Sequence, residues 1–162
     1  MAKRVLCALA SLGFAVALTG CPMPPSAAER ATDAARDSNL AARFGRIDLA
    51  VDHTTPEARD EFLRHRAAWG GYIRIVDVEL GGLRMTDSDH AVFDVDYSWM
   101  RVDEDSLRST RITQRWTSSK GAWLLEGEKR GSGDVGLFGE AVEVLRPPQR
   151  DAQFATKVIR AD

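Results

Sequence analysis

The amino-acid sequence predicts an α+β domain in which N-terminal helices pack on a strongly bent antiparallel sheet. Two observations predict this order of elements. In residues 27–69 apolar side chains recur at helical spacing, and residues typical of helix ends are present. Residues 72–129 alternate between apolar and polar side chains and are interrupted by short polar turns. Helices that precede strands joined by short connections are typical of folds whose helices cover one face of an antiparallel sheet.

The helical region is expected to form three segments. Residues 27–44 are rich in alanine, and their small apolar side chains recur at three- and four-residue spacing. Residues 47–51 continue as a short helix or turn. Thr55 and Pro56 provide a helix cap and a first-turn proline, so a third helix is expected from there to Trp69. Its predicted buried side consists of Phe62, Leu63, His65, Arg66 and Trp69.

The strand region begins after Gly71. Strands are expected at residues 72–80, 83–85, 90–102, 107–117 and 122–129, with a turn at Gly81 and Gly82 between the first two. The clearest strand is 90–102, because its apolar residues fall on one face, and Asp94, Asp96 and Ser98 fall on the other. The predicted core face of this strand consists of Ala91, Phe93, Val95, Tyr97 and Trp99.

The N-terminus has the pattern of a signal peptide. Lys3 and Arg4 precede an apolar stretch over residues 5–18. That stretch is shorter than the ~20 residues that a membrane-spanning helix needs. We therefore expect residues 1–20 to be a cleaved signal peptide.

Leu18-Thr19-Gly20-Cys21 resembles the bacterial lipobox. The resemblance implies that Cys21 receives a diacylglycerol, becomes the mature N-terminus and anchors the protein to a membrane of the bacterial envelope. The alternative is an ordinary secretory signal with a cysteine near its cleavage site. Cys7, the other cysteine, lies in the segment that would be removed, so no disulfide is expected. Pro22 stands where an aspartate would resemble an inner-membrane retention signal, which favours the outer membrane.

Composition restricts the partners of the mature chain. Removing residues 1–20 removes two basic and no acidic side chains, so 20 basic residues oppose 24 acidic ones and the net charge is −4. Such a chain has no basic field with which to hold nucleic acid. About 140 residues remain, which is a usual size for one domain. The predicted organisation is a signal peptide (1–20), a lipidated tether (21–28), one domain (29–130) and an extended C-terminal tail (131–162).

The domain resembles the nuclear transport factor 2-like superfamily, the cone-shaped fold of SnoaL-like proteins and steroid isomerases. The resemblance rests on element order and on residues 110–116 and 121–126, which look like the last two strands of such cones. In those cones a polar turn is followed by a tryptophan and a leucine that close the core, as Trp123 and Leu124 follow the turn here. A lipocalin-like barrel and a cystatin-like single helix on a sheet remain alternatives.

Several ionisable residues are candidates for chemistry. Asp94 and Asp96 could act as an acid–base pair, but their spacing places both on the solvent face of the strand. His65 could face the cone and serve as a base, or it could be a packed or surface histidine. His53 and His90 have no second ligand at metal-binding spacing.

No metal or cofactor is expected. Asp87, Asp89 and His90 approach a metal-binding set, yet they lie in a predicted turn where acidic residues are common. The acidic turn at residues 103–105 lacks the glycine and the spaced ligands of a calcium loop. Residues 131–136 are rich in glycine but lack the ending of a phosphate-binding loop, and an extended loop is expected there.

Large aromatic side chains on the predicted strands and helix could line a pocket for an apolar ligand, or they could simply form the core. The possible lining residues are Trp69, Phe93, Tyr97, Trp116 and Trp123. The sequence therefore favours a non-enzymatic binding or protein-interaction module, which holds an envelope protein or a small apolar ligand. The alternative is a cone-type isomerase, dehydratase or hydrolase of a small apolar molecule. An ionisable side chain that faces a cavity would favour the enzyme.

Overall fold

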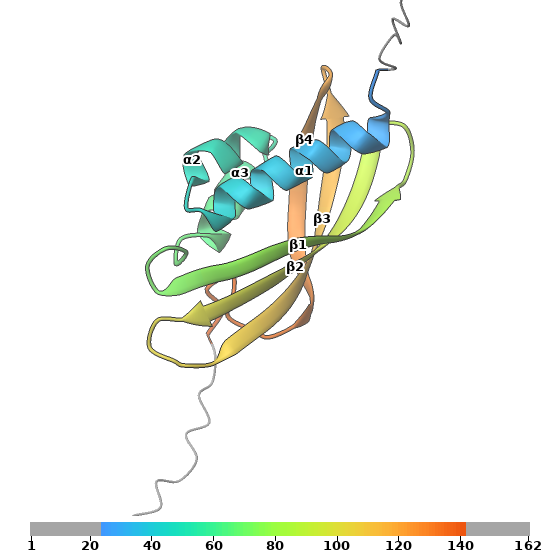
Figure 1. Cartoon of the computed structure of the whole chain (residues 1–162). Helices are drawn as coiled ribbons and strands as arrows, with labels where there is room; N and C mark the ends of the chain where they lie inside the picture. Colours follow the sequence, from blue (N-terminus) through green and yellow to red (C-terminus); the bar gives the residue numbers. More distant parts are fainter. Residues whose placement is uncertain (1–23, 142–162) are drawn as a thin grey trace, which may run out of the picture.

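The computed structural model describes residues 24–141 and confirms the α+β class (Figure 1). Residues 1–23 and 142–162 lie outside the described part, and with them the predicted signal peptide, Cys21 and most of the predicted tail. The helical elements are α1 (Ala27–Arg43), α2 (Ile47–Ala50), a 3₁₀ turn η1 (Val51–His53) and α3 (Arg59–His65). The strands are β1 (Ile73–Met85), β2 (His90–Arg101), β3 (Leu107–Ser119) and β4 (Ala122–Gly133).

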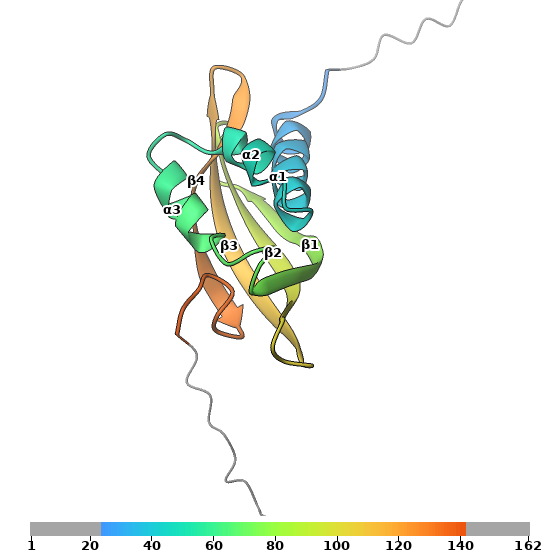
Figure 2. The same cartoon turned by 90° about the vertical axis from the view of Figure 1, so that its left-hand side faces the viewer.

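The four strands form one antiparallel meander in the order β1-β2-β3-β4. The helices lie on one side of this bent sheet: α1 crosses in front of the strands in Figure 1 and is seen nearly end-on beside β1 in Figure 2. The pairing of β2 with β3 runs without interruption from His90 opposite Thr117 to Met100 opposite Leu107. This regular central pair fixes which side chains face the helices.

Helix α1 begins at a capping box and packs through small side chains. The Glu29 amide donates to Ser26 Oγ, and the Ser26 amide donates to the Glu29 carboxylate. The side of the helix that faces the sheet is buried, and it carries alanines with two polar residues among them: Ala31, Ala35, Ser38, Asn39 and Ala42. Because alanine side chains are short, the helix can lie close to the strands.

Helix α3 is shorter than the sequence predicts. Thr55 caps the preceding turn by accepting the Ala58 amide, and the helix ends at His65, well before Trp69. The chain then reverses, because the Ile73 amide donates to the Ala68 carbonyl and the Gly70 amide donates to the Ile73 carbonyl. The prediction that Leu63 is buried is wrong: it is 40% exposed, whereas Phe62, Arg66 and Trp69 are buried at a spacing of four and three residues.

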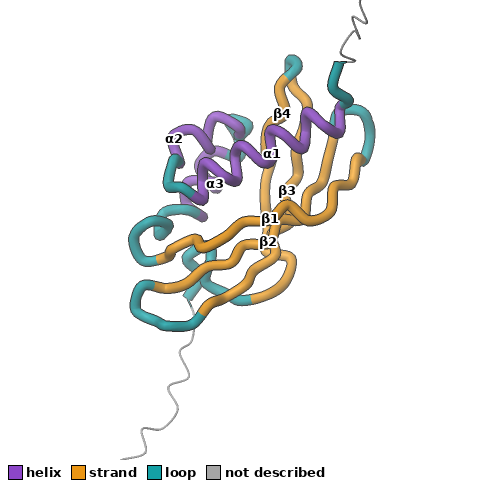
Figure 3. Tube along the Cα trace, in the orientation of Figure 1, coloured by secondary structure: helices purple, strands orange, loops and turns teal. Residues whose placement is uncertain are grey.

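The turn predicted at Gly81 and Gly82 is wrong. Strand β1 passes through both glycines, and Figure 3 shows it as one strand. The pairing register with β2 shifts between Leu80 and Leu83, which is a β-bulge. A Cβ at Gly81 would lie 3.0 Å from the Asp94 carbonyl oxygen, so the glycine permits a close approach of the two strands.

Strand β4 extends to Gly133, so the extended loop predicted from residue 131 is wrong for its first residues. The Asp134 amide still donates to the Ser109 carbonyl of β3. The following residues turn back onto the domain, and Leu137 is 1% exposed. We call residues 134–141 the strap.

The predicted core face of β2 is confirmed. Its odd-numbered residues from Ala91 to Trp99 are buried, and they pack with residues of β3 and β4 beneath the helices: Ile112, Trp116, Trp123 and Leu125. In residues 24–141, no helix combines the length and the apolar character needed to cross a membrane.

Gly133 is expected to be far less tolerant of alanine than Gly121. Both have φ of +87°, but a Cβ at Gly133 would lie 2.3 Å from the Ser109 carbonyl oxygen, whereas Gly121 has open space. Both variants carry the left-handed backbone cost of about 1–2 kcal/mol, and Gly133→Ala adds a collision worth about 1–3 kcal/mol. Urea unfolding of Gly133→Ala and Gly121→Ala measures this difference, and equal losses of stability would contradict the close strand pairing.

Candidate functional site

A cluster of polar side chains lies beneath the helices, on the inner face of the sheet. Each member comes from a different element: Asn39 of α1, Arg66 after α3, Tyr97 of β2, Gln114 of β3 and Glu128 of β4. All five are buried, with exposed fractions of 7% or less. We call these five residues the buried polar network.

The centre of the network is an ion pair between Arg66 and Glu128. Arg66 Nη2 donates to Glu128 Oε2 at 2.9 Å, and Nη1 donates to Oε1, which makes the pair bidentate. The guanidinium carbon also lies 3.6 Å from the centre of the Phe62 ring and 4.8 Å from that of Trp69. The cation is therefore held between a carboxylate and two aromatic rings.

Both members of the pair are charged at neutral pH. Burial acts to raise the pKa of the Glu128 carboxyl, but the charge of Arg66 and hydrogen bonds from Arg66 and His65 outweigh it and hold the pKa at about 2. Burial likewise acts against the charge of Arg66, and Glu128 raises the Arg66 pKa overall. Each charge is stable in the interior because the other is present.

Two amides connect the ion pair to α1 and β2. Gln114 Nε2 donates to Glu128 Oε2 at 3.2 Å and to Asn39 Oδ1 at 2.9 Å. Asn39 Nδ2 donates in return to Gln114 Oε1 at 3.0 Å, and the Tyr97 hydroxyl donates to Asn39 Oδ1. Burial raises the pKa of Tyr97, so the phenol stays neutral.

His65 lies at the edge of the network and is only partly covered. Its Nδ1 is 3.2 Å from Glu128 Oε1 and its Nε2 is 3.7 Å from Glu61 Oε1, while its ring stacks on Phe138 with centroids 3.9 Å apart. It borders an open depression of about 450 Å³ that is also lined by Arg64, Lys129, Arg130 and Glu140. A carboxylate on one ring nitrogen is the arrangement that orients a general base. The structure thus places this predicted candidate at the edge of the buried polar network, with a glutamate carboxylate near each ring nitrogen.

Asp94 and Asp96 lie on the outer face of the sheet and have separate partners. Thr113 Oγ1 donates to Asp94 at 2.9 Å, and the Arg111 guanidinium donates to both oxygens of Asp96 at 2.8 and 2.6 Å. The hydrogen bond from Arg111 lowers the pKa of Asp96. The two carboxyls serve as cross-strand contacts and do not form a dyad.

Asp87 and His90 form a turn. The Asp87 carboxylate accepts the backbone amides of Asp89 and His90 at 2.8 Å and lies 3.0 Å from His90 Nδ1. His53 lies in η1. Residues 24–141 contain no group of three or more histidine, cysteine or acidic side chains that could hold a metal ion.

The five candidate aromatic residues lie in the core beneath the helices, and one of them, Tyr97, is also part of the buried polar network. Their exposed fractions are 9% or less, and they pack against one another, with Trp69 and Tyr97 centroids 5.3 Å apart. The Trp69 indole donates to the Leu137 carbonyl at 2.9 Å, and the Trp116 indole contacts Gln114 Oε1 at 3.3 Å. Among the described residues the buried Trp123 indole nitrogen has no partner. The five aromatic side chains belong to one buried core cluster beneath the helices.

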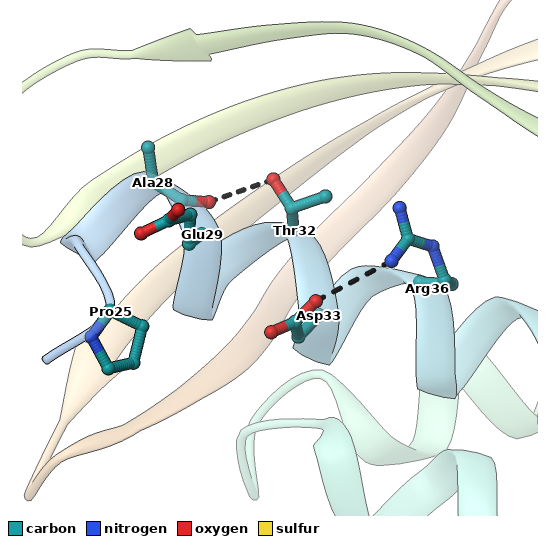
Figure 4. Close-up of a pocket in the computed structure, with 6 residues that line it drawn as sticks. All are labelled: Pro25, Ala28, Glu29, Thr32, Asp33 and Arg36. Atoms are coloured by element: carbon teal, nitrogen blue, oxygen red, sulfur yellow. Dashed lines mark hydrogen bonds and ion pairs between the residues drawn. The ribbon is translucent and has the colours of Figure 1, made fainter. Parts of the chain in front are cut away.

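A second depression, of about 470 Å³, lies on the solvent side of α1 near its start (Figure 4). Its polar contacts are local to the helix: Thr32 Oγ1 donates to the Ala28 carbonyl, and Arg36 pairs with Asp33 at 3.5 Å. Both side chains of that ion pair are more than half exposed. Nothing in this depression is buried or convergent, so it provides no site.

The sequence pattern predicts that Arg66 and Tyr97 are buried, but it did not single out Asn39, Gln114 or Glu128 as their partners. Asn39 follows Ala31 and Ala35 at four-residue spacing on the buried side of α1. Gln114 lies between Ile112 and Trp116 on the buried face of β3. A polar residue at a position where the periodicity requires an apolar one was the available signal.

No family model and no curated protein matches this chain. Solved structures do. A ketosteroid isomerase-like protein from Erwinia carotovora atroseptica superposes with a TM-score of 0.55 at 12% identity, over 65% of this chain and 96% of that one. An NTF2-like protein of unknown function in nutrient uptake from Rhodospirillum rubrum gives a TM-score of 0.50 at 15% identity, over 61% and 94%. A SEC-C motif containing protein from Rhodopseudomonas palustris gives 0.53 at 18% identity, over 65% and 80%.

The chain has the nuclear transport factor 2-like fold. The open four-stranded sheet of the described residues is not the closed barrel of the lipocalin-like alternative. At identities of 18% or less, these structures show the fold of the domain alone, and its chemistry has to be inferred from its own residues.

Glu128→Gln is expected to lower the free energy of unfolding by about 3–5 kcal/mol at pH 7, because it leaves Arg66 buried without its counter-charge. The wild-type advantage should be fully present above about pH 4.5, the ordinary pKa of the carboxyl, and should be lost as the pH falls through about 2. Urea unfolding of both proteins from pH 7 to pH 2 checks this. The matched control is Asp96→Asn, which breaks an exposed pair and should have a much smaller effect. Equal losses for the two variants would contradict the central role of the pair.

Proposed function

We propose that this chain is a membrane-anchored envelope lipoprotein whose cone-like domain is a non-enzymatic binding or protein-interaction module. The observation that supports this most is the state of the cone interior. Its charged groups, Arg66 and Glu128, are paired with each other, and the aromatic side chains around them are buried in one core cluster.

Acid–base catalysis requires a group that reaches the substrate and whose pKa lies near the working pH. Glu128 is a poor base, because its pKa is about 2 and both its oxygens accept hydrogen bonds. Tyr97 is a poor acid, because burial raises its pKa and its hydroxyl already donates to Asn39. The interior is therefore better suited to holding the domain together than to proton transfer.

The anchoring part of the proposal rests on the sequence. Leu18 to Cys21 resembles a lipobox, and four residues separate Cys21 from the helix cap at Ser26. The predicted mature net charge of −4 gives the domain no basic surface that would add to attachment by attraction to anionic lipids. The lipid on Cys21 would be the whole attachment, and Pro22 favours the outer membrane.

The second candidate is a cone-type isomerase, dehydratase or hydrolase. One observation favours it: His65 contacts the Glu128 carboxylate and borders a depression of about 450 Å³. Its Nε2, however, is 3.7 Å from the Glu61 carboxylate, and Phe138 covers one face of its ring. These contacts place the imidazole in a packed position, so we rank the binding module first.

Labelling cells with a radioactive fatty acid tests the anchor. The wild-type chain should incorporate label and fractionate with membranes, whereas Cys21→Ser should incorporate none, because the acylated thiol is gone. Cys7→Ser is the matched control and should label like the wild type. Label that survives Cys21→Ser would refute lipidation of Cys21.

Crosslinking in intact cells tests the interaction module. We expect a discrete envelope protein to copurify with the anchored wild type and not with a form that lacks residues 1–21 and is exported through an ordinary secretory leader. The comparison separates partners met at the membrane from proteins captured by chance. Recovery of no partner with either form would count against a protein-interaction module.

A further inference from the structure

The strap, residues 134–141, covers one end of the buried interior. Leu137 is 1% exposed, and its carbonyl accepts the Trp69 indole N–H at 2.9 Å. The next residue, Phe138, stacks on His65. In Figures 1 and 2 the strap lies near the end of the sheet opposite the start of α1.

The first strap residue, Asp134, is bonded to Ser109 and Thr110 of β3, whereas residues 135–141 hold their own shape and make few bonds to the domain. Glu140 Oε2 accepts the amides of Gly136 and Phe138 at 3.1 and 2.9 Å, and the Gly139 amide donates to the Gly136 carbonyl. Among the described residues, the bond from Trp69 to Leu137 is the one hydrogen bond that joins residues 135–141 to the rest of the domain. An ion pair between Arg130 and Glu140 at 3.5 Å adds to it and is more than one-third exposed on each side. A loop tied so lightly is able to open while the sheet stays folded.

The strap is also the wall between two depressions. One is the depression of about 450 Å³ beside His65, and the other, of about 290 Å³, is lined by Ala68, Tyr72 and Arg101 on the far side. Gly139 and Glu140 line both. The strap therefore contributes to the lining of both depressions.

One buried donor, the Trp69 indole N–H, is paired with the strap itself, and a second, Arg66 Nε, belongs to a guanidinium beside the Trp69 ring and is unpaired. Without Leu137 the Trp69 indole N–H has no acceptor, and the Trp69 ring lies 4.8 Å from the Arg66 guanidinium carbon. Arg66 Nε is buried and has no hydrogen-bond partner among residues 24–141. A buried donor without a partner is rare in folded proteins and carries a free-energy cost that an oxygen acceptor would remove.

We propose that the strap occupies a binding site for an apolar molecule that carries a carboxylate or carbonyl oxygen. In this structure the Leu137 side chain occupies the position of the apolar part of the ligand. The Leu137 carbonyl occupies the position of the ligand oxygen, which would accept the Trp69 indole N–H. The proposal rests on the binding function above and names the class of ligand. The ligand competes with the strap, so its apparent affinity is set by the fraction of molecules in which the strap is open.

Hydrogen exchange of the indole N–H groups, measured by NMR on the mature chain with Cys21→Ser, tests whether the strap opens. The internal reference is Trp99, whose indole donates to Thr110 Oγ1 in the core. Trp69 should exchange at least about tenfold faster than Trp99, and Leu137→Ala should accelerate Trp69 by about tenfold more without changing Trp99. Val135→Ala alters a strap side chain that is 37% exposed and should leave both rates unchanged. Equal rates for Trp69 and Trp99 in the wild type would overturn the proposal.

Octanoate, an apolar carboxylate, tests the ligand class on the same protein. We expect Leu137→Ala to bind octanoate about tenfold more tightly than the wild type, because the competing side chain is gone. Binding should shift the Trp69 indole resonance, and adding Trp69→Phe to Leu137→Ala should reduce the affinity. Equal affinities of the wild type and Leu137→Ala, or binding without a change at Trp69, would overturn the site. These measurements need no membrane and no partner, so their failure is distinct from a failure of the labelling or crosslinking experiments.

Discussion

The ion pair between Arg66 and Glu128 is the interaction on which the arrangement of this domain depends. A buried charge is tolerated only where its partner is placed correctly, and both charges here come from chain segments far apart in sequence. Glu128 fixes the position of Gln114, and Gln114 in turn fixes Asn39 of α1. Because the chain of bonds crosses the helix layer and three strands, a shift of any one element would leave a buried polar group without a partner.

The local sequence pattern was enough to predict the helices and strands in which buried side chains recur at a regular spacing. The alternation over residues 90–102 correctly predicted the core face of β2, and the alanine spacing correctly predicted α1. The local pattern wrongly predicted a turn at Gly81 and Gly82, since a glycine pair fits a turn and a bulge equally well. What decides between them is the Asp94 carbonyl on the neighbouring strand, which is a tertiary contact. The early end of α3 has the same origin, in bonds that the chain makes around Trp69.

The candidate site was harder to predict for the same reason. The sequence singled out His65 and the aromatic residues by type, but the role of each is set by its neighbours. Glu128 was not among the candidates, because a single acid at the end of a strand usually faces water. Its significance comes from Arg66, 62 residues away. The strap was predicted as part of an extended tail, and its burial depends on one leucine that alternation did not single out.

The irregularities of β1 bear on how copies of this protein avoid one another. As an outer strand of the sheet, β1 has one edge without a strand neighbour in the described residues, and such an edge is a template for strands of other molecules. The bulge at Gly81 and Gly82 and the irregularity at Val76 interrupt it, and Arg43 occupies the Val76 carbonyl. A broken edge of this kind disfavours sheet-to-sheet aggregation. Under the proposed lipid anchoring, this would matter most, because anchoring concentrates the copies in two dimensions.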